Sequence, residues 1–368
     1  MTEITQSLDK SVLELLKSLK VEPIPIFDDP PRIVTDSPMF NWTCGGGLPI
    51  GRASQLWGHP GAGKSTMALM IAASVTRQGD RVVLVDMENS YNGTQGQQMG
   101  IDPDKFVVIA PESGEDALAA IIGFIKSGLF KLVILDSIAS MRFSAEADPS
   151  ALHSLQPGYQ SRANSKFARM ANAALPDSGC ALLIINQTRS VIGGIHGPTE
   201  VYGGGWALKH LLSLSVKMLD AHYITATGKE ASTLGGTRGN GIAALKTRWR
   251  VDKSKVGEPG RDGEAIFTTS HWGLSDIEEI ATLAFTFGLY SDKDGEPKTT
   301  KVGGFFMGEA KLGSGSGLNS VIDAMYSDND TYLLVKQAVD DHIADTGTVP
   351  VLTSQNEDMN DAITNPLT

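Results

Sequence analysis

The segment from Gly58 to Ser65, with the sequence GHPGAGKS, has the residue types and spacing of a phosphate-binding P-loop. It follows a short apolar run and opens a helical pattern, which is the context that the motif requires. Its glycines allow backbone amides to turn toward phosphate oxygens at a helix N-terminus, Lys64 can reach the outer phosphates, and Ser65 offers a hydroxyl to Mg²⁺. The predicted nucleotide-binding residues are Gly58, His59, Pro60, Gly61, Ala62, Gly63, Lys64, Ser65 and Thr66. We therefore expect a nucleoside triphosphate and Mg²⁺ as cofactors.

Polar side chains stand where other apolar runs end. Asp136 closes the run KLVILD, an arrangement that places a carboxylate near the metal of a P-loop protein, so Ser65 and Asp136 are the predicted metal ligands. Glu88 follows the run VLVDM and could polarise the water that attacks the γ-phosphate. Asp86 competes for this role, and the residues alone leave the choice open. Gln187 follows the run ALLIIN, where an uncharged amide can hydrogen-bond a γ-phosphate or its attacking water.

The spacing of apolar residues predicts the elements that position these groups. Apolar runs typical of buried parallel strands lie at 53–58, 81–87, 105–110, 131–137 and 181–186. Helical patterns lie at 65–79, 114–128 and 159–175. The alternation predicts an α/β fold with a mostly parallel, twisted sheet flanked by helices. The runs at 211–219, 241–253 and 264–270 are expected to be antiparallel strands that extend this sheet.

The pattern predicts four parts along the chain. Residues 1–35 hold an amphipathic helix at 11–19 and a proline-rich linker, an arm that could dock on a neighbouring subunit or pack on its own chain. Residues 36–270 form the core, and residues 271–345 form a small α+β C-terminal domain. Residues 346–368 have no periodicity and are expected to be disordered.

The formal charge of −11 is unevenly distributed. Between Ser320 and Thr368 nine acidic residues stand against one lysine, Lys336, and this net −8 leaves about −3 for the rest of the chain. The balance excludes a generally basic nucleic-acid binder but permits a local site. Cys44 and Cys180 are far apart in sequence, so neither a disulfide framework nor a zinc site is expected. With no apolar stretch near the length of a membrane span and no secretory signal, we expect a cytoplasmic protein without a membrane partner.

Further motifs follow one another along the chain: GGLPIGRASQLWG before the P-loop, then DMEN, MGID, VILDSIAS, INQTR, GGGWALK and VDKSKVGEP. Together with the P-loop they resemble the RecA family, and more loosely the phage-encoded recombinases of the UvsX type. The similarity covers about residues 36–290. It implies a RecA-like P-loop NTPase core that uses ATP, in a divergent, phage-encoded homologue.

The resemblance implies roles that composition cannot assign. Glu88 occupies the position of the family's catalytic glutamate, and Gln187 that of an amide sensor that links the γ-phosphate to a DNA-binding loop. Lys253 and Lys255 match a lysine pair that reaches across the subunit interface to the neighbour's nucleotide, where cations stabilise transition-state charge. Gln95 stands where the family typically has a tyrosine that stacks on adenine, so the contact with the base is expected to differ.

The resemblance also implies where DNA binds. The segments 141–158 and 189–204 match the family's mobile DNA-binding loops, which hold phosphates and leave the bases free to test pairing. The expected DNA contacts are Arg162 and Arg189 to phosphates, and Ile192, Ile195 and His196 in the second loop.

The function expected from this resemblance is that of an ATP-dependent DNA recombinase. Such a protein is a DNA-dependent ATPase that forms a homo-oligomeric helical filament on single-stranded DNA and pairs it with homologous double-stranded DNA. Two alternatives share the same core: a hexameric helicase, and a mediator that loads another recombinase. Electron micrographs distinguish a helicase, which forms closed rings, from a recombinase, which forms open filaments. Strand exchange together with DNA-stimulated hydrolysis would exclude the mediator.

Overall fold

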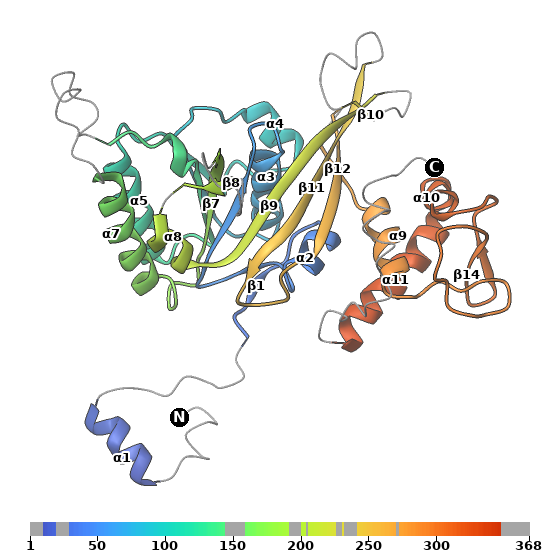
Figure 1. The fold of residues 1–368 in the computed structure, drawn as a ribbon, viewed down its shortest axis with the longest axis horizontal. Helices are drawn as coiled ribbons and strands as arrows, with labels where there is room; N and C mark the ends of the chain where they lie inside the picture. The colour runs from blue at the N-terminus through green and yellow to red at the C-terminus, as the bar shows by residue number, and fades with distance from the viewer. Residues whose placement is uncertain are drawn as a thin grey trace. The chain divides into compact units, whose positions relative to one another are not determined.

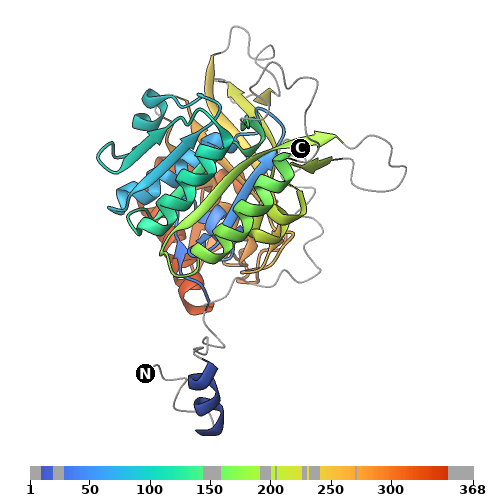
Figure 2. The same ribbon diagram turned by 90° about the vertical axis from the view of Figure 1, so that its left-hand side faces the viewer.

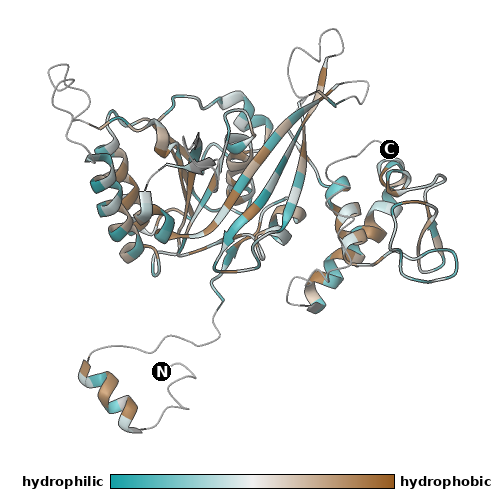
Figure 3. Cartoon of the chain, in the orientation of Figure 1, coloured by the Kyte–Doolittle hydropathy of each residue, from teal (hydrophilic) through white to brown (hydrophobic). Residues whose placement is uncertain are grey.

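The structure is a computed structural model that describes residues 10–19, 29–143, 159–190, 200–203, 205–225, 230–231, 241–269 and 272–346. The chain divides into two compact units, Met1–Pro31 and Arg32–Thr368. The first unit contains the helix α1 (Lys10–Leu19), which confirms the helix predicted at 11–19. Its exposed apolar side chains include Leu15 and Leu19, and Figure 3 shows apolar and polar residues on different sides of this helix.

The second unit is built on a mixed sheet whose strands follow the order β13-β12-β11-β9-β3-β7-β6-β4-β5 (Figure 1). The mutually parallel strands are β3 (Ala53–Gly58), β4 (Val82–Asp86), β5 (Phe106–Ile109), β6 (Leu132–Asp136) and β7 (Ala181–Ser190). The strands that extend the sheet are β9 (Leu212–Thr225), β11 (Ile242–Ser254), β12 (Asp262–Thr268) and β13 (Leu274–Ser275). The α/β fold class is therefore confirmed.

Two details of the sheet differ from expectation. Strand β9 is antiparallel to β11, as predicted, but parallel to β3, because α8 carries the chain back to the amino edge of the sheet before β9 begins. Strand β5 was expected to be buried, yet its Val107 and Val108 side chains are 42% and 38% exposed. Among the strands of the described residues, β5 is the last in the sheet order and pairs only with β4, so part of its surface faces solvent.

Helices cover both faces of the sheet because the buried strands are apolar on both sides. On β6, Ile134 belongs to the core cluster that includes α3 (Lys64–Arg77), whereas Val133 belongs to the cluster formed with the helices of the other face. Those helices are α5 (Gly114–Ser127), α7 (Tyr159–Ala174) and α8 (Gly205–Leu211). Figure 2 shows the green helix α7 lying across the strands.

The remaining elements of the second unit are helices and short strands. They comprise α2 (Pro38–Thr43), α4 (Gly93–Gln98), α9 (Ile277–Thr286), α10 (Leu318–Ser327) and α11 (Asn329–Thr346). The short elements are β1 (Arg32–Ile33), β2 (Leu48–Pro49), β8 (Glu200–Tyr202), β10 (Glu230–Ala231), β14 (Phe305–Met307), β15 (Ala310–Leu312) and the 3₁₀ helix η2 (Ile138–Ser140). None of the helices in the described ranges is long and apolar enough to span a bilayer.

A buried carboxylate joins α9 to α2. Glu279, on α9, is 3% exposed. It accepts hydrogen bonds from the Ser37 hydroxyl (2.8 Å) and from the Met39 backbone amide (3.0 Å) at the start of α2. Burial raises the pKa of Glu279 to about 8, although these two hydrogen bonds oppose the rise. The contact fixes the C-terminal helices to the core through a polar group that water does not reach.

Candidate active site

The P-loop lies between the carboxyl end of β3 and the start of α3, as its sequence predicted. Gly63 precedes the helix with a φ of +84°, in the left-handed region that favours glycine. A Cβ atom at Gly63 would lie 2.7 Å from the Thr247 hydroxyl, and that hydroxyl donates to the Ala62 carbonyl (3.0 Å). Strand β11 therefore supports the loop from one side, and within the loop the Ala62 amide donates to the His59 carbonyl (3.2 Å).

Lys64 is drawn back onto its own loop. Its ammonium group donates to the carbonyls of His59 (2.7 Å) and Gly58 (3.1 Å). The pKa of Lys64 is lowered overall, because the effect of burial exceeds the opposing effect of the carboxylates of Asp136 and Glu88. An arriving polyphosphate would replace the two carbonyl contacts with a charged partner, which is the role expected of this lysine.

Ser65 and Asp136 meet at the expected metal position. The Ser65 hydroxyl donates to the Asp136 carboxylate (2.7 Å), so β6 and the first turn of α3 bring together two hard oxygen ligands. Burial raises the pKa of Asp136 to about 6, and the charges of Glu88 and Asp86 add to this rise. A divalent cation between the two oxygens would relieve the buried charge, so the residues present fit Mg²⁺.

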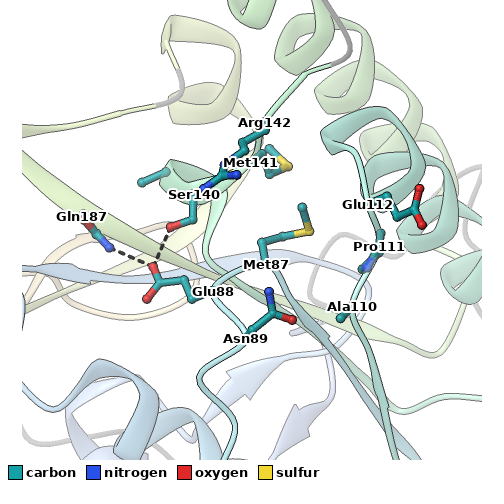
Figure 4. Close-up of a pocket in the computed structure, with 11 residues that line it drawn as sticks. Met87, Glu88, Asn89, Ala110, Pro111, Glu112, Ser140, Met141, Arg142 and Gln187 are labelled. Atoms are coloured by element: carbon teal, nitrogen blue, oxygen red, sulfur yellow. Dashed lines mark hydrogen bonds between the residues drawn. The ribbon is translucent and has the colours of Figure 1, made fainter. Parts of the chain in front are cut away.

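Glu88 is held by donors from two other elements. One of its carboxylate oxygens accepts hydrogen bonds from the Ser137 hydroxyl (2.6 Å), the Ser140 hydroxyl (2.7 Å) and the Gln187 side-chain amide (2.8 Å). Figure 4 shows the Gln187 and Ser140 contacts at the edge of a cavity of about 810 Å³. Burial raises the pKa of Glu88, but these hydrogen bonds and the charge of Lys64 outweigh it and lower the pKa overall.

Asp86, the competing candidate for the base, faces the backbone. Its carboxylate accepts from the amides of Glu88 (3.1 Å), Ser90 (2.9 Å) and Tyr91 (2.9 Å), and it is 4% exposed. These bonds shape the turn after β4, in which Asn89 adopts a φ of +53°. All three hydrogen bonds of Glu88 fall on one carboxylate oxygen, whereas both oxygens of the buried Asp86 accept from the turn, so the geometry favours Glu88 as the group that can receive a proton.

The amides at the end of β7 connect this carboxylate to the segment beyond it. Gln187 bonds to Glu88, and the neighbouring Asn186 donates its side-chain amide to the Gly203 carbonyl (2.9 Å). Strand β7 continues to Ser190 and pairs with β8 through Thr188 and Tyr202. Arg189 thus follows Gln187 by two residues, and Gly203 is held by Asn186, the neighbour of Gln187.

Lys253 and Lys255 do not join the P-loop of their own chain. Their ammonium groups donate to the carbonyls of Lys209 and His210 respectively, in the last turn of α8. In the sheet register Lys253 is level with Gln55, three residues before β3 ends at Gly58. The pair is displaced toward the amino ends of the parallel strands, which is compatible with action on another chain's nucleotide.

Gln95 lies next to the nucleotide loop. It belongs to α4 and lines a cavity of about 50 Å³ together with Ser65, Tyr91 and Asp136. Tyr91 packs on Phe106, with ring centroids 5.5 Å apart, and a Cβ atom on Gly96 would lie 2.4 Å from its hydroxyl. The ring of Tyr91 is therefore engaged in packing, and a glutamine amide stands at the position expected to meet the base.

The predicted DNA contacts are only partly described. Arg162 is exposed on α7. The Arg189 backbone belongs to β7, while its side chain and the residues Ile192, Ile195 and His196 lie outside the described residues. The same holds for most of the predicted loop 141–158 and for the tail beyond Thr346.

Sequence reasoning missed two hydroxyls of the site. Ser137 and Ser140 both bind Glu88 and lie 2.9 Å from each other. They follow Asp136 directly in the segment DSIAS, so hydroxyls placed just after a metal-binding carboxylate were the available signal. Neither could be linked to Glu88, because the two segments are 49 to 52 residues apart in the chain.

The chain is similar in sequence to known proteins. Residues 32–268 match the family model described as the RecA N-terminal domain. Protein RecA of Chlorobaculum tepidum is 33% identical over 285 residues, which cover 77% of this chain and 76% of that protein. Protein RecA of Chlorobaculum parvum is 31% identical over 318 residues, 86% of this chain and 84% of that protein. DNA repair protein recA homolog 1, chloroplastic, of Arabidopsis thaliana is 32% identical over 220 residues, 60% of this chain and 48% of that protein.

A P-loop at the carboxyl edge of a mostly parallel sheet, with a carboxylate at the end of a neighbouring strand, defines a P-loop NTPase with a RecA-like core. The chain belongs to the RecA family, because the family model and relatives of similar length cover most of it. It is accordingly a DNA-dependent ATPase with the function of a RecA recombinase. The expected family, fold and enzyme class are confirmed.

Proposed function

We propose that Glu88 activates the water that attacks ATP and that Gln187 reports the state of the nucleotide to the DNA-binding segment. The observation that carries this proposal is the hydrogen bond of 2.8 Å between the two side chains. It joins the turn after β4 to strand β7, whose last residues, Arg189 and Ser190, begin the segment 189–204. A γ-phosphate that competes for the Gln187 amide would change the position of this strand end.

Each residue of the site has its own role in the proposed reaction. Glu88, with its lowered pKa, is ionised at neutral pH and can take a proton from water. Ser137 and Ser140 orient its carboxylate through their hydroxyls. Lys64 and the P-loop amides bind the phosphates. Ser65 and Asp136 would hold Mg²⁺, which supplies charge neutralisation at the phosphates when it is bound.

The proposal includes assembly into a helical filament. Lys253 and Lys255 of one protomer would complete the nucleotide site of the next, so that ATP occupancy and filament geometry form one equilibrium. Their displacement from their own P-loop along the sheet supports this arrangement. The filament would bind single-stranded DNA and pair it with homologous duplex, with Arg162 and Arg189 on phosphates, and with Ile192, Ile195 and His196 in the second loop near the bases.

The identity of 31–33% to the bacterial RecA proteins and the glutamine at position 95 support a divergent homologue, which we propose to be phage-encoded. Its proposed place of action is the cytoplasm of a bacterium, where the DNA substrate is found. Gln95 would contact adenine through its amide rather than through a stacked ring.

The test is ATP hydrolysis with and without single-stranded oligonucleotide, combined with strand exchange and electron microscopy. We expect DNA-stimulated hydrolysis, open filaments and exchange that requires ATP, all abolished by Lys64→Ala. Normal hydrolysis by an isolated monomer that ignores added DNA would overturn the proposal. Closed rings without strand exchange would point instead to a helicase built on the same core.

A further inference from the structure

Helix α8 carries an exposed tryptophan directly after the segment proposed to bind DNA. Trp206 is 77% exposed. The other tryptophans of the chain, Trp42, Trp57, Trp249 and Trp272, are buried or half-buried. A large aromatic side chain left in water gains free energy when a partner covers it. The exposed indole therefore offers a surface on which a binding partner can pack.

The groups around Trp206 identify the chemistry of that partner. The Lys209 ammonium lies 5.5 Å from the centroid of the Trp206 ring and 5.3 Å from that of Tyr202. His210 stacks on the indole at 6.3 Å, with the ring planes 28° apart. A cation between two aromatic rings, one of them open to solvent, combines a π-face for a base with a positive charge for a phosphate.

The helix packed against α8 is basic as well. Helix α7 carries Arg162, Lys166 and Arg169, all exposed and spaced so that they share one face. Its first turn lies against the start of α8, because a Cβ atom at Gly205 would be 3.6 Å from the Ser161 hydroxyl. Neither described helix contains an aspartate or glutamate, in a chain with a formal charge of −11. This local excess of cations favours a polyanion.

We propose that Trp206 and Lys209 form an additional contact for single-stranded DNA. The indole stacks on one unpaired base, and the Lys209 ammonium pairs with an adjacent phosphate. The inference rests on the proposed DNA binding and adds a base-stacking residue to it. The alternative occupant, a second copy of this chain, is an outcome of the test below.

Tryptophan fluorescence gives the first measurement. The emission of the full chain, with Mg²⁺ and a non-hydrolysable ATP analogue, is quenched by acrylamide before and after addition of oligo(dT). Because Trp206 is the exposed ring among the chain's tryptophans, most of the accessible emission should come from it. We expect oligo(dT) to quench this emission and protect it from acrylamide, and Trp206→Phe to remove both changes.

Affinity separates base stacking from electrostatic attraction. Trp206→Ala should weaken binding of oligo(dT) about five-fold or more, because base–aromatic stacking contributes about 1–3 kcal/mol per base. It should leave unchanged the binding of an oligonucleotide of equal length made of abasic sites, and Trp206→Phe should retain most of the oligo(dT) affinity. Lys209→Gln should weaken both ligands and reduce the salt dependence by about 0.7 in the slope of log K against log salt.

The matched control is Leu129→Ala. Leu129 is 60% exposed and precedes β6, at the amino edge of the parallel strands, so both affinities should match the wild type. If Trp206→Ala lowered the affinity for both ligands equally, the ring would contact a second copy and the inference would be wrong. If the wild-type chain bound oligo(dT) and Trp206→Ala bound it as tightly, the inference alone would fail. If the wild-type chain bound no oligo(dT), the proposed DNA binding would fail too.

Discussion

Replacing Glu88 with glutamine separates the effect of its charge, which we propose to be catalytic, from the effect of the hydrogen bonds that hold it. Glutamine keeps an oxygen that can accept from Ser137, Ser140 and Gln187, the three donors that Glu88 uses. The change from a charged to a neutral acceptor weakens each bond, but the site is partly open to solvent, so we expect a loss of at most about 1 kcal/mol in folding free energy. The loss of the general base should lower kcat about 100- to 10,000-fold.

ATP binding should survive this substitution. Glu88→Gln removes a negative charge near the Lys64 ammonium and leaves the P-loop and Asp136 in place. The variant should therefore bind ATP as tightly as the wild type or more tightly, and it should remain in the ATP-bound filament on DNA. Single-turnover hydrolysis, nucleotide binding and filament lifetime measure these three properties separately.

Asp86→Asn is the matched control because Asp86 is the other acidic candidate. Its two carboxylate oxygens accept from three backbone amides, and asparagine has a single acceptor oxygen, so buried amides lose their partner. We expect this variant to lose about 1–3 kcal/mol of folding free energy per unpaired amide. The reasoning is refuted if Glu88→Gln hydrolyses ATP at the wild-type rate, or if Asp86→Asn folds normally and loses only the chemical step.

Three further predictions concern assembly, charge and pH. We expect no activity from a Lys253→Ala/Lys255→Ala double variant or from Lys64→Ala alone. An equimolar mixture of the two should regain activity, because about one quarter of randomly mixed junctions pair an intact P-loop with intact lysines. A mixture without activity would contradict completion of the site in trans. Truncation after Thr346 should strengthen DNA binding at low salt, because the acidic tail competes with phosphate for the same cations, and an unchanged salt dependence argues against this. The pKa of Glu279 is raised from 4.5 to about 8, so its contribution to stability is complete below about pH 4.5 and is lost as the pH rises through about 8. Urea unfolding should show this loss in the wild type and a flatter pH profile in Glu279→Gln, whereas parallel profiles would exclude Glu279 as the cause.

The amino-acid sequence determined the chemistry that depends on neighbours in the chain. The P-loop is eight consecutive residues between a strand and a helix, so its glycines, Lys64 and Ser65 could be assigned directly. Asp136 was predicted to be a metal ligand because it closes an apolar run in a chain that carries a P-loop. The short apolar runs predicted the parallel strands, since alternating side chains on both faces of a buried strand must all be apolar.

Only the tertiary structure distinguished the surroundings of the two candidate carboxylates. Asp86 and Glu88 are two residues apart and chemically alike, yet one binds backbone amides and the other meets Gln187, 99 residues along the chain. Such a contact depends on the order of strands in the sheet and on the register of each pair. The exposure of β5, the parallel pairing of β9 and the location of Lys253 depend on the same choices. Local spacing specifies which groups a segment carries, whereas the packing of distant segments specifies which groups meet.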